Sequence, residues 1–312
     1  MARNWWQAGR TVTAAAVVTV MLACCSGNDP VPSSSSPPAW PASGTRTVEV
    51  AGRPVTVHVP ASYDSSRSVP LVVALHGYTS DAKELESYLR LTPESDRRGF
   101  VYAYPDGSTD DQGEHLWNAT DACCAFAEPK PDDSRYLSEL ISTIRDAYRI
   151  DRARVYLIGH SNGGFMTFRM ACDHADQVTA IASLNGAGWN DASRCQPAEP
   201  VSVLAIHSTA DETVAFDGGD INGIGYPSAA TTVAQWVSYN GCATAGRDAE
   251  GLDLVTDLPA TETSVRFYRQ GCAAGSTVQA WTINDGSHVP ELGPGFAPAV
   301  TDFLLSQAKR AR

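Results

Sequence analysis

The chain has 312 residues and a formal net charge of −12 at neutral pH. Nucleic acid and anionic membrane surfaces would repel such an acidic chain at long range, so the composition argues against both as partners. A chain of this length could hold two domains, although α/β folds of this size commonly form one.

The first 24 residues have the layout of a secretory signal peptide. Arg3 and Arg10 precede an apolar stretch that is too short to cross a bilayer comfortably. The stretch ends in "MLACCSG", which resembles a bacterial lipobox, where a lipidated cysteine becomes the mature N-terminus. Cys24 and Cys25 are both candidates for that cysteine, and an ordinary signal peptide with incidental cysteines is the alternative.

Residues 25–44 are expected to form an extended tether, because they are rich in Ser and Pro and have no hydrophobic period. The folded domain is then expected to span residues 45–312. These features predict an extracytoplasmic protein, either a membrane lipoprotein or a secreted one. Any membrane contact would be made through the N-terminal lipid alone.

Cleavage before Cys25 would leave six cysteines downstream of the lipidated one, an even number. They are Cys123, Cys124, Cys172, Cys195, Cys242 and Cys272. In an oxidising compartment we expect disulfides rather than metal ligands, and no CxxC or CxxH spacing argues for zinc. A bridge from Cys242 to Cys272 is the best guess, and a vicinal bond between Cys123 and Cys124 is the least expected.

The folded part begins with alternating apolar and polar residues over 45–60, which predict two antiparallel strands. Short apolar runs follow, typical of strands that are buried on both faces, at 70–77, 100–107, 153–159, 180–186 and 201–208. Helical patterns separate these runs, the clearest over 134–150. Further strands near 264–269 and 278–283 and a closing helix over 296–308 complete the pattern. It predicts one α/β domain, with a mostly parallel sheet flanked by helices.

The stretch "LIGHSNGGFM" places Ser161 between a buried strand and a helix. A GxSxG motif alone is a weak signal, and a serine that merely caps the helix is the alternative. Strand, turn and helix around the motif are what a nucleophile elbow needs, since glycines permit a strained turn that exposes the serine. We therefore predict that Ser161 is a nucleophile.

A serine hydroxyl needs a base within hydrogen-bond reach and an acid that fixes the tautomer of the base. In this fold the chain order is Ser, acid, His. The loop "NDGSHVPEL" places His288 after the last strand, where the base should lie, while His174 and His207 are the alternatives. Asp211 follows a buried strand and is the expected acid.

Two other carboxylates are candidates for the acid. Glu212 is the neighbour of Asp211, and Asp285 lies close to His288 in sequence. Either could instead be a solvated loop charge, as could Asp211.

Acyl transfer also needs backbone donors for the oxyanion of the transition state. One should be the N–H of Asn162, the residue after the nucleophile. The other should come from the loop after 70–77, and Tyr78 is the expected donor with Thr79 close behind. His76 is expected to support that loop, and His160 is expected to point away from the serine hydroxyl.

Several blocks together resemble the polyhydroxybutyrate depolymerase and feruloyl esterase group of α/β-hydrolases, including its lipoprotein members. They are "LHGYTSDA", "LWNATDACC", "PDDSRYLSELI", "IDRARVYLIGHSNGGFMTFRMAC", "IHSTADETVAFDGG", "AQWVSYNGC" and "INDGSHVPEL". The resemblance implies an extracytoplasmic serine esterase of α/β-hydrolase fold. It implies Ser161, Asp211 and His288 as the triad, structural disulfides, and a structural role for Asp132 and Asp133.

The chain departs from that family at two positions beside the acyl site. Tyr78 stands where members usually carry Cys, and Val289-Pro290 follow the histidine where many have Trp. The substrates of the family therefore do not transfer directly. Pocket tryptophans would be Trp117, Trp236 and Trp281, and a core role is the alternative for each.

The expected function is hydrolysis of carboxylic esters through an acyl-enzyme, without metal or organic cofactor. Hydroxyalkanoate oligomers and feruloyl or acetyl esters of polysaccharides are the substrate classes considered. An acyltransferase, a serine peptidase of the same fold and a non-catalytic cell-surface binding protein are the alternatives.

Overall fold

The computed structural model describes residues 43–259 and 261–309. The expected signal peptide, the lipidation candidates Cys24 and Cys25, and residues 25–42 of the expected tether lie outside this range. Within the described residues, the first strand begins at Gly44.

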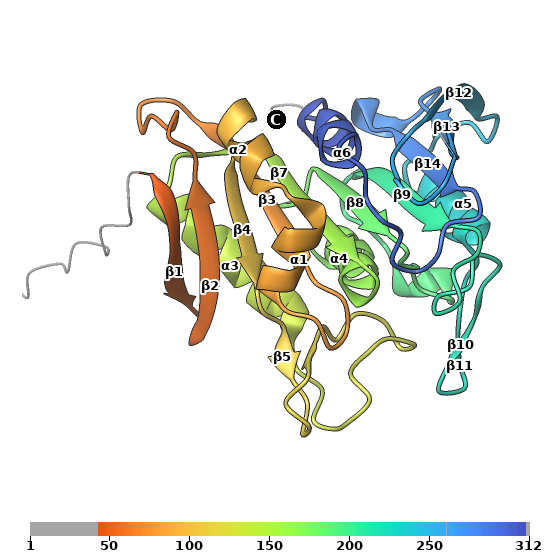
Figure 1. Ribbon diagram of the computed structural model, residues 1–312, viewed down its shortest axis with the longest axis horizontal. Helices are drawn as coiled ribbons and strands as arrows, with labels where there is room; N and C mark the ends of the chain where they lie inside the picture. The colour runs from red at the N-terminus through yellow and green to blue at the C-terminus, as the bar shows by residue number, and fades with distance from the viewer. Residues whose placement is uncertain (1–42, 260, 310–312) are drawn as a thin grey trace, which may run out of the picture. The chain divides into compact units, whose positions relative to one another are not determined.

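Within the described residues, ten strands form one sheet (Figure 1). Their order is β1 (Gly44–Val50), β2 (Arg53–Val59), β4 (Val101–Pro105), β3 (Val69–Leu75), β7 (Ile150–His160), β8 (Ala180–Leu184), β9 (Ser202–Ser208), β14 (Val278–Ile283), β13 (Thr263–Tyr268) and β12 (Arg247–Leu252). The neighbouring strands from β4 to β14 pair in parallel. At one edge β1 and β2, and at the other β13 and β12, each pair antiparallel with their neighbours. The predicted mostly parallel sheet is confirmed.

The central strands are apolar throughout because both of their faces are covered by helices. In β3, Leu71 and Val73 belong to one hydrophobic cluster, while Val72 and Ala74 belong to the other. All four side chains are completely buried. The period-2 alternation of a strand thus divides one apolar run between two cores.

Helices cover the two faces of the sheet separately (Figure 1). α3 (Asp133–Ala147), α4 (Asn162–Asp173) and α5 (Ala229–Tyr239) contribute to one core. α1 (Ala82–Leu89) and α6 (Phe296–Leu305) contribute to the other, and α2 (Thr92–Arg98) lies against α6. None of the helices in the described ranges is both long and apolar enough to span a bilayer.

Some elements were not predicted from the sequence. They are β12, the pair β5 (Ser108–Thr109) and β6 (His115–Leu116), the pair β10 (Gly219–Ile221) and β11 (Ile224–Tyr226), and the 3₁₀ turns Ala192–Arg194 and Ala273–Gly275. β12 is a polar, largely exposed edge strand, "RDAEGL", which carries no apolar pattern. Its pairing with β13, rather than its own composition, makes it a strand.

The six cysteines of the folded part form three disulfides. Cys242 bonds Cys272, as expected, and Cys172 bonds Cys195. The expectation about the remaining pair is wrong, because Cys123 bonds its neighbour Cys124. The turn around them is tight: the N–H groups of Ala119 and Thr120 both donate to the Cys123 carbonyl.

The three tryptophans considered as pocket residues are core residues. Trp117, Trp236 and Trp281 are at most 5% exposed. Trp236 stacks on Phe168 between α5 and α4, and Trp281 packs in the core that α6 covers. All three are thus packed in the core, and Trp281 also lines a cavity of about 180 Å³ together with His207 and Phe216.

Candidate active site

The candidate catalytic residues follow four strands of the parallel part of the sheet. Tyr78 follows β3, Ser161 follows β7, Asp211 follows β9 and His288 follows β14. β3 pairs with β7 and β9 pairs with β14, with β8 between the two pairs. Parallel strands end at the same edge, so residues distant in sequence converge where α/β sheets generally bind ligands.

The turn that carries Ser161 has a backbone that requires glycine around it. Ser161 itself has φ 54° and ψ −120°, outside the regions that L-residues favour. A Cβ on Gly159 would lie 2.2 Å from the Gly163 carbonyl oxygen, and one on Gly163 would lie 1.9 Å from the Leu75 carbonyl oxygen. The glycines of "GHSNGG" therefore let β7, α4 and β3 approach closely enough to hold the serine in this conformation.

The three candidate side chains form a continuous hydrogen-bonded chain. Ser161 Oγ lies 2.8 Å from His288 Nε2. His288 Nδ1 lies 2.8 and 2.9 Å from the two carboxylate oxygens of Asp211. Since an ionised carboxylate can only accept, Nδ1 carries the proton and Nε2 is left to accept the serine proton. This is the geometry that a general base needs.

The surroundings of Asp211 keep it ionised. Burial by itself would raise the pKa of this carboxyl group, but hydrogen bonds from His207 and His288 outweigh burial and lower the pKa below its usual range. Oδ1 also accepts the N–H groups of Thr213 and Val214, at 2.9 and 2.8 Å. The carboxylate can thus stabilise a positive charge on the His288 ring.

The alternative acids and bases lie in other positions. Glu212 accepts the backbone N–H of His288 at 3.3 Å and does not contact its ring. Asp285 is held through its backbone N–H by Thr209. His207 contacts the Val214 carbonyl at 2.8 Å, and His174 ends α4 beside Ser134. None of these four contacts Ser161.

Two buried side chains that the sequence did not single out for this purpose hold the His288 loop. Nε2 of His160 and Nδ2 of Asn185 both hydrogen-bond the carbonyl oxygen of His288, at 2.9 and 2.8 Å. Burial lowers the pKa of His160 to about 4, so the ring is neutral. The His160 ring bonds the His288 carbonyl, a contact with the histidine loop that the sequence did not predict.

Asn185 connects three strand ends. It follows β8 with φ 53°, a conformation that Asn tolerates better than most residues. Its Oδ1 accepts the Ser208 N–H at 2.8 Å while Nδ2 donates to the His288 carbonyl. The sequence signal for this role was the Asn-Gly pair that ends the run 180–186.

Two backbone N–H groups near Ser161 have no hydrogen-bond acceptor among the described residues. They belong to Asn162, the first residue of α4, and to Tyr78. Thr79, the other candidate, donates its N–H to the His115 carbonyl at 2.9 Å. The helix N-terminus adds a positive potential at Asn162. Both N–H groups are available for an oxyanion.

The loop that carries Tyr78 is fixed by His76. Nδ1 of this buried ring donates to the Gly77 carbonyl at 2.7 Å, and Nε2 accepts the Gly107 N–H at 2.8 Å. Burial lowers the pKa of His76. A neutral ring that supports the loop matches the expected role.

The side chain of Asn162 has a structural role that the sequence did not indicate. Its Oδ1 accepts the Trp117 N–H at 2.7 Å and its Nδ2 donates to the Trp117 carbonyl at 2.8 Å. Nδ2 also contacts Cys123 Sγ at 3.4 Å. The residue after the nucleophile thus holds the disulfide-bonded loop against the elbow.

A comparison with known protein families shows to which family the chain belongs. The family model described as "Esterase PHB depolymerase" matches residues 56–235, more than half of the chain. The chain belongs to this esterase family. The membership indicated by the sequence blocks is confirmed.

Individual relatives of this esterase carry esterase names. NocK of Nocardia uniformis subsp. tsuyamanensis, named as an esterase, is 29% identical over 90% of this chain and 84% of its own length. Feruloyl esterase D of Neurospora crassa is 25% identical over 84% of each chain. Feruloyl esterase B of Piromyces equi is 27% identical over 76% of this chain, which spans only 42% of that longer protein.

Solved structures agree on the fold. An acetyl xylan esterase from Aspergillus awamori superposes with a TM-score of 0.61 at 16% identity, covering 84% of this chain and 98% of that one. A thermostable esterase gives a TM-score of 0.54 at 16% identity, over 85% of this chain and 63% of that one. The α/β-hydrolase fold of this esterase is confirmed.

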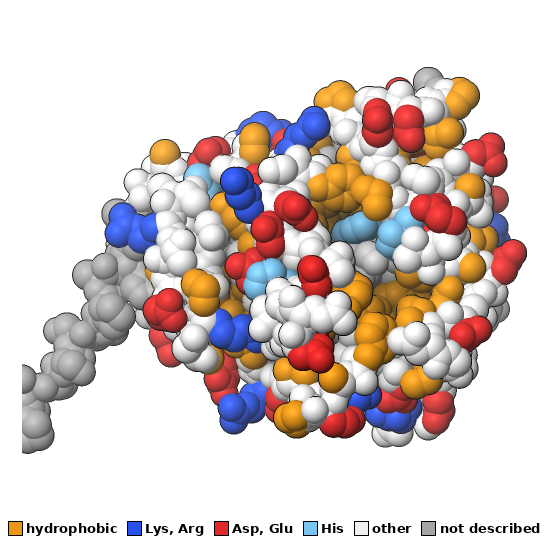
Figure 2. All heavy atoms as spheres, turned by 60° about the horizontal axis from the view of Figure 1, so that its bottom comes forward, with side chains coloured by type: hydrophobic (Ala, Val, Ile, Leu, Met, Phe, Trp, Pro, Cys, Tyr) orange, Lys and Arg blue, Asp and Glu red, His pale blue; other side chains and the backbone are white. Residues whose placement is uncertain are grey.

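The face of the esterase that carries histidine side chains is hollowed. Figure 2 shows these histidines among hydrophobic side chains, with acidic side chains around them. A cavity of about 310 Å³ lies beside Tyr78. No group of His, Cys, Asp and Glu side chains within residues 43–259 and 261–309 is arranged to hold a metal ion.

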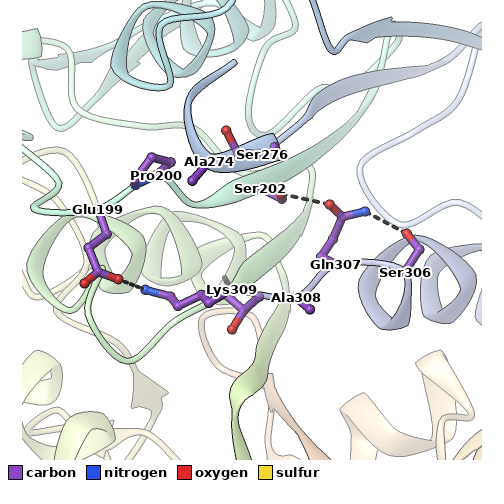
Figure 3. A pocket seen from close by; sticks show the side chains of 11 residues that line it. Glu199, Pro200, Ser202, Ala274, Ser276, Ser306, Gln307, Ala308 and Lys309 are labelled. Atoms are coloured by element: carbon purple, nitrogen blue, oxygen red, sulfur yellow. Dashed lines mark hydrogen bonds and ion pairs between the residues drawn. The ribbon is translucent and has the colours of Figure 1, made fainter. Parts of the chain in front are cut away.

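A larger cavity, about 560 Å³, lies elsewhere, beside the start of β9 and the chain after α6. Figure 3 shows that its polar side chains pair with one another: Lys309 with Glu199, and Gln307 with Ser202 and Ser306. It holds neither Ser161 nor His288. The hydrogen-bonded chain, rather than cavity size, therefore locates the candidate site.

Proposed function

We propose that the protein hydrolyses carboxylic esters through an acyl-enzyme formed on Ser161. His288 Nε2 takes the serine proton as Oγ bonds to the ester carbonyl carbon. The electron pair of the carbonyl moves to its oxygen, which the N–H groups of Asn162 and Tyr78 stabilise. The intermediate collapses, and the leaving alkoxide takes the proton from His288.

Deacylation repeats these steps with water. His288 takes a proton from water, hydroxide adds to the acyl carbon, and Ser161 leaves and recovers its proton from His288. The observation that carries the proposal is the unbroken chain from Ser161 Oγ to Asp211, next to two unused backbone N–H groups. No metal or organic cofactor takes part in any step.

The relatives supply the proposed substrate class. Two are named feruloyl esterases and one superposed structure is an acetyl xylan esterase. We therefore propose esters carried by polysaccharides, with hydroxyalkanoate oligomers as the second class. We propose that these esters are reached outside the cytoplasm, where the N-terminal segment predicts the protein.

The test is active-site labelling combined with hydrolysis. A fluorophosphonate should label Ser161, and Ser161→Ala should abolish labelling and lower kcat on a feruloyl or acetyl ester at least ~10³-fold. Circular dichroism of the variant should match that of the wild type. Folded wild-type protein that neither reacts with the probe nor cleaves any ester would refute the enzyme and leave a binding protein.

A further inference from the structure

A groove runs beside the oxyanion loop. It is lined by Tyr78, Thr109, Asp110, Asp111, Gln112, Leu116, Cys124, Ala125, Phe126, Ala127, Glu128, Pro129 and Pro131, and its volume is about 310 Å³. These residues come from the loop after β3, the β5–β6 hairpin and the segment after the vicinal disulfide. The catalytic steps proposed above use none of their side chains.

Two exposed aromatic rings form one wall of this groove. Tyr78 is 36% exposed and Phe126 is 49% exposed, and their ring centres lie 6.0 Å apart at 82°. Large apolar side chains with this exposure are few in the described residues, and the other two are Ile224 and Val289. A pair of solvent-facing rings in one groove offers apolar surface to a ligand.

The groove is bordered by the two loops that lie next to Ser161 and Asn162. The Tyr78 backbone N–H is the proposed oxyanion donor, and a Cβ on the preceding Gly77 would lie 3.4 Å from Ser161 Cβ. On the other wall, Cys124 is bonded to Cys123, whose sulfur contacts the Asn162 side chain. These contacts place the groove beside the loops that form the proposed oxyanion site.

The charges of the groove restrict what can bind there. Asp110, Asp111 and Glu128 line it, and neither Lys nor Arg is among its lining residues. Anionic groups such as uronates and phosphates would be repelled. Carboxylates and carbonyls instead accept hydrogen bonds from hydroxyl groups.

The groove is less well suited to a cation than to a neutral ring. The Asp110 carboxylate is already engaged by the N–H groups of Gln112 and Glu114 and by the Tyr78 hydroxyl, at 2.9, 2.9 and 3.1 Å. The two rings stand edge to face, so they present one face and one edge rather than walls that surround a cation. A flat, uncharged ring with hydroxyl groups fits both the aromatic wall and the acceptors.

We infer that this groove binds a neutral sugar residue of the alcohol part of the substrate, stacked on Phe126 and Tyr78. The inference rests on the proposed ester hydrolysis and narrows its substrates to esters of neutral glycans.

Binding of an unesterified sugar tests the groove without catalysis. Xylotriose is titrated into the full folded domain and followed by protein-observed NMR, with choline and a galacturonate trimer in parallel. The dissociation constant for xylotriose should rise about 10-fold in Phe126→Ala. It should not change in Phe267→Ala, which removes a partly exposed ring from β13, far from the groove in strand order.

A kinetic ratio tests whether the groove acts on the reaction. For each variant, kcat/KM is measured on a xylose-linked ester and on the methyl ester of the same acid. The ratio of the two should fall about 10-fold in Phe126→Ala and stay constant in Phe267→Ala. A ratio near one in the wild type, or the same ratio in Phe126→Ala, would overturn the inference.

The two proposals fail in different ways. Xylotriose binding that depends on Phe126, in a protein that cleaves no ester, would support the groove and refute the esterase mechanism. Ester cleavage without detectable xylotriose binding would support the esterase mechanism and refute the sugar-binding groove. Tighter binding of choline or galacturonate than of xylotriose would overturn the neutral-sugar assignment.

Discussion

Ser161 and its partners, Asp211 and His288, are positioned by different physical means. The turn that carries Ser161 is fixed by backbone contacts, because neighbouring glycines bring carbonyl groups within a distance that excludes any side chain. The loop that carries His288 is held by two side chains from other segments, Asn185 and His160, and Asn185 also accepts the N–H of Ser208, which ends the strand before Asp211. Substitutions should therefore affect folding on the nucleophile side and catalysis on the acid–base side.

The largest effect should come from the acid itself. Asp211→Asn keeps the shape of the side chain but removes the charge and favours the wrong tautomer of His288. We expect kcat on a simple ester to fall about 10³- to 10⁴-fold. Glu212→Gln is the matched control, since Glu212 contacts only the backbone of His288. A loss below 10-fold in Asp211→Asn, or an equal loss in the control, would exclude Asp211 as the acid.

Substitution of the glycines around Ser161 should lower the stability of the fold. Gly163→Ala places a Cβ against the Leu75 carbonyl, which cannot rotate away. We expect the free energy of unfolding to fall by about 3 kcal/mol or more, or the chain not to fold. In Gly188→Ala the nearest atom to the added Cβ lies at 3.4 Å, so urea unfolding should change little. Equal behaviour of the two variants would contradict the role of the elbow glycines.

The buried His160 should make stability depend on pH. Its pKa is about 4 in the folded chain and near 6.5 when unfolded, so the unfolded state binds more protons between these values. This contribution is complete above pH 6.5 and is lost as the pH falls toward 4. Between pH 7 and 4.5, the wild type should lose about 2 kcal/mol more unfolding free energy than His160→Gln.

Urea unfolding at the two pH values measures that difference. Asp211, whose lowered pKa acts at a more acidic pH, leaves this window undisturbed. Parallel pH profiles for wild type and His160→Gln would show that His160 is not held neutral by the fold.

Substitution of Asn185 should have a smaller effect on catalysis. Asn185→Asp tolerates the same backbone conformation and keeps an oxygen for the Ser208 N–H, but it cannot donate to the His288 carbonyl. We expect kcat to fall at least about 10-fold with KM nearly unchanged, and stability to fall as well, because a buried carboxylate would face the His288 carbonyl. Asn190→Asp, at an exposed position, is the control. A rise in KM with kcat intact would assign Asn185 to substrate binding instead.

The short apolar runs were sufficient to predict the parallel strands, because strands buried on both faces cannot be polar. β12 could not be predicted in this way: "RDAEGL" is polar, and only pairing with β13 makes it a strand. The vicinal disulfide was misjudged for a similar reason. Which cysteines meet depends on how the turn at 119–124 and the other four cysteines are placed.

The sequence by itself determined the local requirements of this esterase: a strand, a glycine-rich turn and a helix around Ser161, and an acid and a histidine after later strands. These follow from backbone sterics and burial, which act over a few residues. Only the tertiary structure decided which groups meet: Asn185 and His160 on one carbonyl, Asn162 on Trp117, and Tyr78 against Phe126. Such contacts join segments far apart in the chain, and no local pattern encodes the distance between them.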